Sequence, residues 1–162
     1  QLMEAGAEFD IKPFGIRAMD AMRLEKSYRL IPREMSIEYS AFESGLDRFV
    51  RLDKEQDFIG KEALSAWQER GADNGFVTLE VLGVTDADAR GSEAIYKDGE
   101  VVGRATSGGY GWRCGKSLAL GLVQKDLTEI GTELEIEILG EKYKTVVVEE
   151  SPFDPTNECL RA

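Results

Sequence analysis

The chain has 162 residues, a length typical of one domain or of part of a larger protein. It carries 20 Lys and Arg against 31 Asp and Glu, a formal net charge of −11, and 42% of its residues are apolar. The apolar fraction suffices for a packed core, whereas the acidic balance argues against non-specific binding to nucleic acid or to an anionic membrane. The absence of histidine excludes Ser-His and Cys-His dyads, histidine zinc sites and histidine general bases.

The cysteines, the lack of long apolar runs and the first residues of the chain each lead to an expectation. Cys114 and Cys159 are too few for a four-cysteine zinc site, and we expect two reduced, partly buried thiols. No run of about 18 apolar residues is present, so we expect no membrane-spanning helix, and no secretory signal opens the chain. The sequence begins without Met, inside a helical pattern over residues 1–9, which suggests a piece of a longer protein.

The first half of the chain, residues 1–74, favours helix. The clearest helix is predicted over residues 15–29, after Pro13 and before Pro32. Its apolar residues recur at helical spacing and form one face: Ile16, Ala18, Met19, Ala21, Met22 and Leu24. The remaining predictions for this half are a loop over residues 34–47, a short strand over 49–52, and a helix over 60–70 that ends at Gly71.

The second half, residues 75–162, favours short strands separated by turns. The predicted strands are residues 76–82, 94–96, 101–106, 118–123, 134–138 and 143–148. Asp98-Gly99 is typical of the tight turn in a hairpin, and strict alternation places Glu133, Glu135 and Glu137 on one solvent-facing side. We therefore expect an α+β fold, with a helical or mixed N-terminal segment followed by a small antiparallel β-barrel or a sandwich.

A glycine-rich stretch, residues 107–117, superficially suggests a phosphate-binding loop. That loop needs Gly, four residues and then Gly-Lys-Ser, and the first position falls here on Tyr110. A strand-like run follows instead of a helix, so no helix N-terminus is available to hold a phosphate. We instead expect a loop that leaves the hairpin and presents Tyr110 and Trp112, and such a loop can line a ligand cleft. No acidic cluster has calcium-loop spacing, and we predict no metal site.

The most informative cluster lies at the end of the first predicted helix. Arg23, Glu25, Tyr28 and Arg29 place two cations, a carboxylate and an aromatic ring within two helical turns. One interpretation is an exposed helix stabilised by ion pairs three and four residues apart. The other is one wall of a pocket, where Tyr28 stacks on a flat heterocycle and Glu25 or Arg23 fixes its polar edge. The local pattern leaves both open.

The order and spacing of several motifs resemble the aminomethyltransferase family, which includes the tetrahydrofolate-dependent T-protein of the glycine cleavage system. The motifs of the first half are Lys12-Pro-Phe-Gly-Ile-Arg, Ala21-Met-Arg-Leu-Glu-Lys-Ser-Tyr, Phe42-Glu-Ser-Gly-Leu and Phe58-Ile-Gly-Lys. Those of the second half are Val102-Gly-Arg-Ala-Thr-Ser-Gly, Lys116-Ser-Leu-Ala-Leu-Gly-Leu and Pro152-Phe-Asp-Pro. Within the family, residues 23–26 and 45–54 look closest to the C-terminal region of dimethylglycine and sarcosine dehydrogenases.

The resemblance implies both an architecture and an activity. Residues 1–74 would form the end of a folate-binding domain and residues 75–162 a C-terminal barrel domain, with the missing N-terminal half of the module as a packing partner. The parent protein would pass a one-carbon unit from an N-methyl amine to tetrahydrofolate, with FAD held only in a part that this chain lacks. The resemblance implies a cytoplasmic protein, or a mitochondrial matrix protein in a eukaryote. The alternatives are a stand-alone T-protein or folate-dependent demethylase, and a non-catalytic structural module.

The resemblance also implies a set of cofactor-binding residues. Tyr28 resembles an aromatic residue that contacts folate in T-proteins, and Glu25 lies in the Arg-Leu-Glu motif beside it. Glu43 and Arg48, in the following loop, complete the expected folate site. The family's catalytic Asp would lie upstream of the first residue, so we expect no catalytic residue in this chain and no activity from it alone. Met19 departs from the family pattern, because T-proteins carry an Arg at that position.

Overall fold

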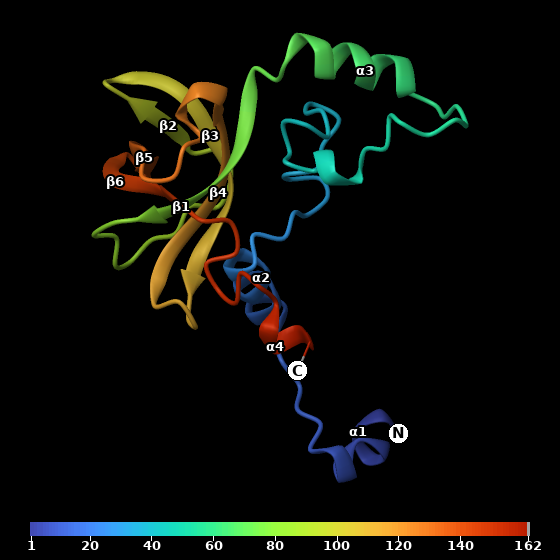
Figure 1. Cartoon of the computed structure of the whole chain (residues 1–162). Helices are drawn as coiled ribbons and strands as arrows, with labels where there is room; N and C mark the ends of the chain where they lie inside the picture. The colour runs from blue at the N-terminus through green and yellow to red at the C-terminus, as the bar shows by residue number, and fades with distance from the viewer. Residues whose placement is uncertain (162) are drawn as a thin grey trace.

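The second half of the chain closes into an antiparallel barrel with the strand order β1-β4-β3-β2-β5-β6 (Figure 1). The computed structural model describes residues 1–161. The strands are β1 (Asn74–Val81), β2 (Ala94–Lys97), β3 (Glu100–Gly111), β4 (Lys116–Gln124), β5 (Glu133–Ile138) and β6 (Glu141–Val148). The α+β fold and the closed barrel predicted from the sequence are thus confirmed.

Alternating side chains of these strands fill the barrel. Leu79, Ile95 and Ile136 are fully buried, and each contributes about 1.5–3 kcal/mol relative to exposure. The predicted hairpin turn is also confirmed: Asp98 and Gly99 both have positive φ, at 51° and 86°, as a tight hairpin turn requires.

The strand pairings of the barrel differ in length. β3 and β4 pair from Gly103↔Val123 to Gly111↔Lys116, with one bulge. In contrast, β2 and β5 pair only at Ile95↔Ile136 and Tyr96↔Glu135. The junction between β2 and β5 is therefore the shortest of the pairings that close the barrel.

The glycine-rich stretch differs from its prediction in its first half. Residues 107–111 continue strand β3 instead of forming a loop, and only residues 112–115 turn toward β4. The glycines allow a close approach, because a Cβ at Gly108 would lie 2.5 Å from the carbonyl oxygen of Ala89. Tyr110 and Trp112 are exposed, as predicted.

The first long helix, α2 (Ile16–Glu25), ends four residues earlier than its periodicity predicts. Ser27 adopts a left-handed conformation with φ of 52°, and its hydroxyl shares a buried hydrogen bond of 2.7 Å with Thr78 of β1. This contact with the barrel turns the chain before Arg29. The second predicted helix is confirmed as α3 (Lys61–Arg70), with Gly71 at its C-terminus in a positive-φ conformation.

The strand predicted over residues 49–52 is wrong. A 3-10 helix, η2 (Asp47–Phe49), stands there, and the N–H of Val50 donates to the carbonyl of Asp47 to close a turn. All strands of the described residues 1–161 belong to the barrel, and none of them pairs with this segment. The remaining short helices are α1 (Leu2–Ala5), η1 (Ala7–Phe9), η3 (Lys125–Leu127) and α4 (Glu158–Arg161).

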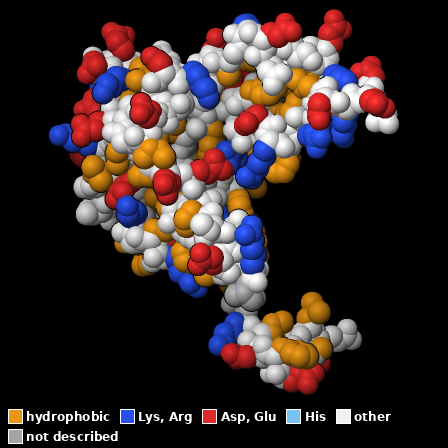
Figure 2. All heavy atoms as spheres, in the orientation of Figure 1, with side chains coloured by type: hydrophobic (Ala, Val, Ile, Leu, Met, Phe, Trp, Pro, Cys, Tyr) orange, Lys and Arg blue, Asp and Glu red, His pale blue; other side chains and the backbone are white. Residues whose placement is uncertain are grey.

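The two faces of α2 have different surroundings. Leu24 is fully buried against the barrel, whereas Ile16, Met19 and Met22 form a stripe that is 44–73% exposed. The stripe faces away from the barrel. The segment carrying α1 projects from the rest of the molecule, and apolar side chains gather on it (Figures 1 and 2). Within residues 1–161, no helix combines the length and the apolar character that a membrane crossing requires.

Candidate functional site

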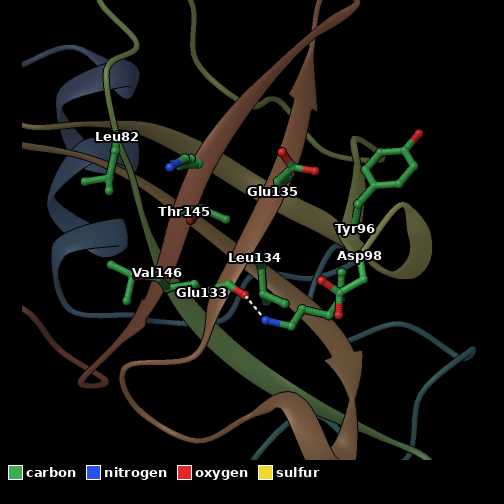
Figure 3. Close-up of a pocket in the computed structure, with 10 residues that line it drawn as sticks. Leu82, Tyr96, Asp98, Glu133, Leu134, Glu135, Thr145 and Val146 are labelled. Carbon is green, nitrogen blue, oxygen red and sulfur yellow. Dashed lines mark hydrogen bonds between the residues drawn. The ribbon is translucent and has the colours of Figure 1, made fainter.

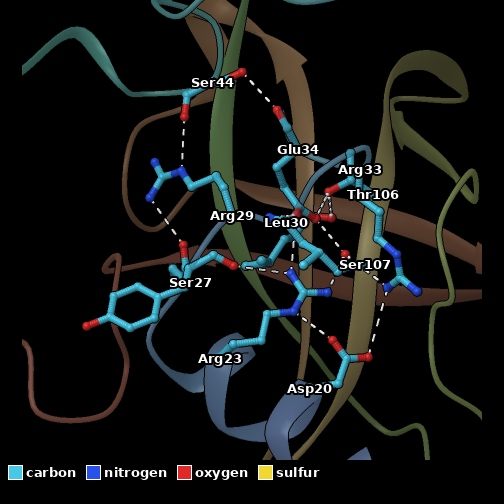
Figure 4. A network of polar contacts seen from close by, with 12 residues as sticks. Asp20, Arg23, Ser27, Arg29, Leu30, Arg33, Glu34, Ser44, Thr106 and Ser107 are labelled. Carbon is cyan, nitrogen blue, oxygen red and sulfur yellow. Dashed lines mark hydrogen bonds and ion pairs between the residues drawn. The ribbon is translucent and has the colours of Figure 1, made fainter. Parts of the chain in front are cut away.

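A buried polar network joins α2, the loop after it and strand β3, and Glu34 lies at its centre (Figure 4). Glu34 is fully buried. Its Oε2 accepts hydrogen bonds from Arg23 Nη1 at 3.2 Å and from the N–H of Leu30 at 2.8 Å. Its Oε1 accepts hydrogen bonds from the hydroxyls of Thr106 at 2.7 Å and Ser107 at 2.5 Å. The carboxylate thereby fixes the loop against the barrel.

Arg23 completes this network from the helix side. Its Nε pairs with Asp20 at 2.6 Å, and its Nη2 donates to the hydroxyl of Ser107 at 2.8 Å. Asp20 and Arg23 thus form an ion pair three residues apart on α2, but the Arg23 side chain is largely buried and does not lie on an exposed helix face. We did not predict Glu34, because its hydroxyl partners lie 72 and 73 residues away in the chain.

Arg29 forms a second anchor. Its guanidinium lies 3.8 Å from the centre of the Phe76 ring, donates to the carbonyl of Ser44 at 3.0 Å, and pairs with Glu150. The helix pair with Glu25 that its spacing suggests does not form. These contacts tie the loop to β1 and to the C-terminal segment, so the region around Tyr28 is held on both sides.

The predicted site residues Glu25 and Tyr28 face different surroundings. Glu25 is buried, and its Oε1 accepts hydrogen bonds from the N–H of Arg113 at 2.5 Å and of Cys114 at 3.2 Å. Its carboxylate thus holds the turn between β3 and β4. The Tyr28 side chain is 51% exposed, and its hydroxyl makes no hydrogen bond within residues 1–161. The ring is available for stacking.

Glu43 and Arg48 are also separated by their contacts. Glu43 is buried, and its carboxylate accepts hydrogen bonds from the N–H of Ser40 at 2.9 Å and from Asn74 Nδ2 at 3.2 Å. Arg48 is exposed, and its guanidinium lies 4.8 Å from the centre of the Phe49 ring. Of the four predicted residues, Tyr28 and Arg48 therefore face solvent, while the two carboxylates bind groups of the chain itself.

A cavity of about 290 Å³ lies on the barrel surface beside β5 and β6 (Figure 3). Glu133 and Glu135, predicted to be solvated, line it together with Leu134 and Thr145. Lys97 Nζ donates to the carbonyl oxygen of Glu133 at 2.9 Å and so crosses one side of the cavity. This internal contact uses one of the three donors of the ammonium group.

The thiols and acidic groups offer little further chemistry. Cys114 and Cys159 are both free, but Cys159 is exposed, contrary to the expectation of partial burial. Burial and the nearby Glu25 carboxylate raise the pKa of the Cys114 thiol, which disfavours the reactive thiolate. Among the described residues, no group of three acidic or cysteine side chains is placed to hold a metal ion.

The barrel and the segment packed on it define the class of protein. The crystal structure of the glycine cleavage system aminomethyltransferase T from Bartonella henselae has the same fold, with a TM-score of 0.84 and 23% identity, over 93% of this chain and 42% of that one. Residues 75–154 match the glycine cleavage T-protein C-terminal barrel domain, and residues 1–54 match the GCVT N-terminal domain. The chain belongs to the glycine cleavage T-protein family.

The curated relatives fall into two groups. Mitochondrial dimethylglycine dehydrogenase of Homo sapiens is 42% identical over 162 residues, which are 99% of this chain but 19% of that protein. The aminomethyltransferase of Bacillus cytotoxicus is 36% identical over 153 residues, which are 94% of this chain and 41% of that protein. The chain therefore spans less than half the length of the relatives it matches. Both comparisons confirm the family to which the sequence motifs pointed.

Proposed function

We propose that the chain is the C-terminal part of a tetrahydrofolate-dependent aminomethyltransferase-like module in a dimethylglycine or sarcosine dehydrogenase. The observation that carries the proposal is the 42% identity to human dimethylglycine dehydrogenase over essentially the whole chain. In this proposal, a flavin held outside this chain would take a hydride from the N-methyl group of the amine substrate. Tetrahydrofolate would supply the two nitrogens that accept the one-carbon unit as the demethylated amine is released.

Some of the predicted residues of this chain fit one wall of a folate cleft. Tyr28 offers an exposed ring, and a flat pterin stacks well on such a ring. Arg48 offers an exposed cation. Glu25 and Glu43 act in this proposal as positioning residues, because their carboxylates hold the backbone on which the exposed groups are mounted. We place the boundary between the folate-binding part and the barrel domain at residues 74 and 75, where β1 begins.

The exposed stripe of α2 fits the rest of such a module. Ile16, Met19 and Met22 are apolar and largely uncovered, and water contact with such a stripe is unfavourable. The stripe is the surface on which we place the preceding part of the module. The Tyr28 ring and the stripe both belong to the segment that begins at α2. A cleft formed there would therefore have one wall from this chain and one wall from the preceding part of the module.

The proposal is tested on the full-length protein by isothermal titration with tetrahydrofolate. The Tyr28→Ala variant is expected to weaken binding by about 1–3 kcal/mol, the scale of one aromatic stacking contact. Tyr28→Phe keeps the ring and is the matched control, with affinity close to that of the unaltered protein. Equal affinity of all three proteins would show that Tyr28 is not a folate contact, and no binding at all would favour a structural module.

A stand-alone aminomethyltransferase is the second candidate, favoured by the 36% identity to the Bacillus cytotoxicus enzyme. The two candidates differ in their substrate and in flavin content. Dimethylglycine oxidation by the full-length protein, followed through the bleaching of flavin absorbance, supports the dehydrogenase. A protein without flavin absorbance that forms 5,10-methylenetetrahydrofolate supports the second candidate.

A further inference from the structure

A groove of about 300 Å³ runs between α2 and strand β3, on the side of α2 opposite the exposed stripe. We call it the α2–β3 groove. Its walls come from four separate segments: α2, the loop after α2, the connection from β1 to β2, and the end of β3 with the turn that follows it. Its floor includes Gly108 and Gly109, which carry no side chain into the space. The volume is at the lower end of the range of about 300–1,000 Å³ that is typical of small-molecule sites.

Three arginines converge on this groove from positions far apart in the chain, namely Arg17, Arg33 and Arg90. Within residues 1–161, the guanidinium groups of Arg17 and Arg90 form no ion pair and no hydrogen bond. Arg33 Nη1 donates to the hydroxyl of Ser107 at 3.3 Å and lies 4.0 Å from the Asp20 carboxylate, so Arg33 is already paired. Such a convergence is unexpected in a chain with a net charge of −11, where carboxylates to neutralise it are plentiful.

The acidic residues of the groove do not cancel this charge. Two carboxylates, Asp20 and Asp88, line the groove together with the three arginines, so the lining has a formal net charge of 3 − 2 = +1. Asp20 is in addition held by Arg23, at 2.6 Å. The groove thus retains cationic groups with unused hydrogen-bond donors, and guanidinium groups bind carboxylates and phosphates through paired donors.

An aromatic pair stands at one end of the groove. The rings of Tyr110 and Trp112 lie 4.9 Å apart at an interplanar angle of 76°, and Trp112 is 80% exposed. An exposed indole held edge-to-face by a second ring is unfavourably hydrated and offers a flat surface for stacking. This pair is the part of the glycine-rich stretch that the sequence marked as able to line a cleft.

A second cavity adjoins the groove. It has a volume of about 270 Å³, and it shares Arg33 and Arg90 with the groove. Arg104 also lines it but pairs with Glu38, so among the described residues Arg90, which lines both spaces, is the arginine of this cavity that has no ion pair.

We propose that the α2–β3 groove binds a small aromatic anion, in which a flat ring stacks on Trp112 and a phosphate or carboxylate is held by Arg17 and Arg90. The site differs from the folate cleft proposed above, because Tyr28, Glu25, Glu43 and Arg48 do not line the groove. The outcome of a test of the groove therefore does not decide the folate proposal, and the reverse also holds.

The first experiment titrates the full-length protein with adenosine 5′-monophosphate and with anthranilate by calorimetry. These probes join an aromatic ring to a phosphate and to a carboxylate, and their relative affinities identify the anionic group. Adenosine and ribose 5-phosphate supply the ring and the phosphate separately. We expect one of the two aromatic anions to bind more tightly than either part, and binding to weaken as salt is added. Binding of neither aromatic anion would overturn the proposal.

The second experiment locates the binding. Arg90→Gln and Trp112→Ala are each expected to weaken the preferred probe about ten-fold or more, the usual effect of losing one charge-assisted hydrogen bond or one stacked ring. Arg51→Gln and Trp67→Ala are the matched controls, because both side chains lie outside the groove and should leave the affinity unchanged. Equal affinity in Arg90→Gln and the controls would refute the site. Displacement of the probe by tetrahydrofolate would refute its separation from the folate cleft.

Discussion

Removal of the Glu34 carboxylate is expected to cost more stability than any other single side-chain change in the first half of the chain. Glu34 is fully buried and accepts four hydrogen bonds, and its partner Arg23 is only 10% exposed in its side chain. The Glu34→Ala variant leaves this guanidinium buried with one carboxylate partner fewer and the Ser107 hydroxyl without its acceptor, while the Thr106 hydroxyl keeps only the Leu120 carbonyl. Breaking a buried ion pair in this way costs about 3–5 kcal/mol.

Urea denaturation followed by circular dichroism measures this loss, and thermal unfolding provides a second reading. At about 2–4 °C per kcal/mol for a protein of this size, the midpoint is expected to fall by roughly 6–20 °C. Asp53→Asn is the matched control, since Asp53 pairs with Arg51 on the surface, where water screens the ion pair and its loss should leave the stability nearly unchanged. A loss below 1 kcal/mol for Glu34→Ala, equal to that of the control, would refute the assigned role of the network.

Two further predictions follow from the turn after β3 and from β3 itself. Because burial and the Glu25 carboxylate raise the pKa of the Cys114 thiol, its alkylation by iodoacetamide should accelerate only at a higher pH than that of free cysteine, and Glu25→Gln should shift this profile toward lower pH. Peptide mass spectrometry isolates the Cys114 peptide, and an unchanged profile would contradict the effect of the carboxylate. Gly108→Ala would place a Cβ 2.5 Å from the Ala89 carbonyl oxygen and should cost about 1–3 kcal/mol in urea denaturation, which a neutral result would disprove.

The barrel was largely predictable from local patterns. Alternation identified β5, and Asp98-Gly99 identified the hairpin between β2 and β3, because both signals depend on neighbouring residues. The end of α2 was not predictable. The sequence predicts helix to residue 29, but Ser27 takes a left-handed conformation and its hydroxyl bonds Thr78, which lies 51 residues further on.

In the candidate site, too, only the features that depend on neighbouring residues were predictable from the sequence. The Arg-Leu-Glu motif predicted a cluster of polar contacts at the end of α2, but sequence could not tell that the Glu25 carboxylate binds the backbone of residues 113 and 114. Glu34 carries no local signal, because its role depends on two hydroxyls brought together by β3. Charge clusters predict where polar contacts form, whereas the choice of partner is made by the tertiary fold.

The short pairing between β2 and β5 affects the unfolding of the barrel as well as its closure. Local opening is expected to begin there, because fewer backbone hydrogen bonds must break than at any other pairing. Each opening exposes two strand edges, and such edges can recruit strands of other molecules into aggregates. The charged side chains of Lys97 and Glu135 border this junction, and charge on an edge disfavours that recruitment. The most easily opened part of the barrel therefore carries its own protection against aggregation.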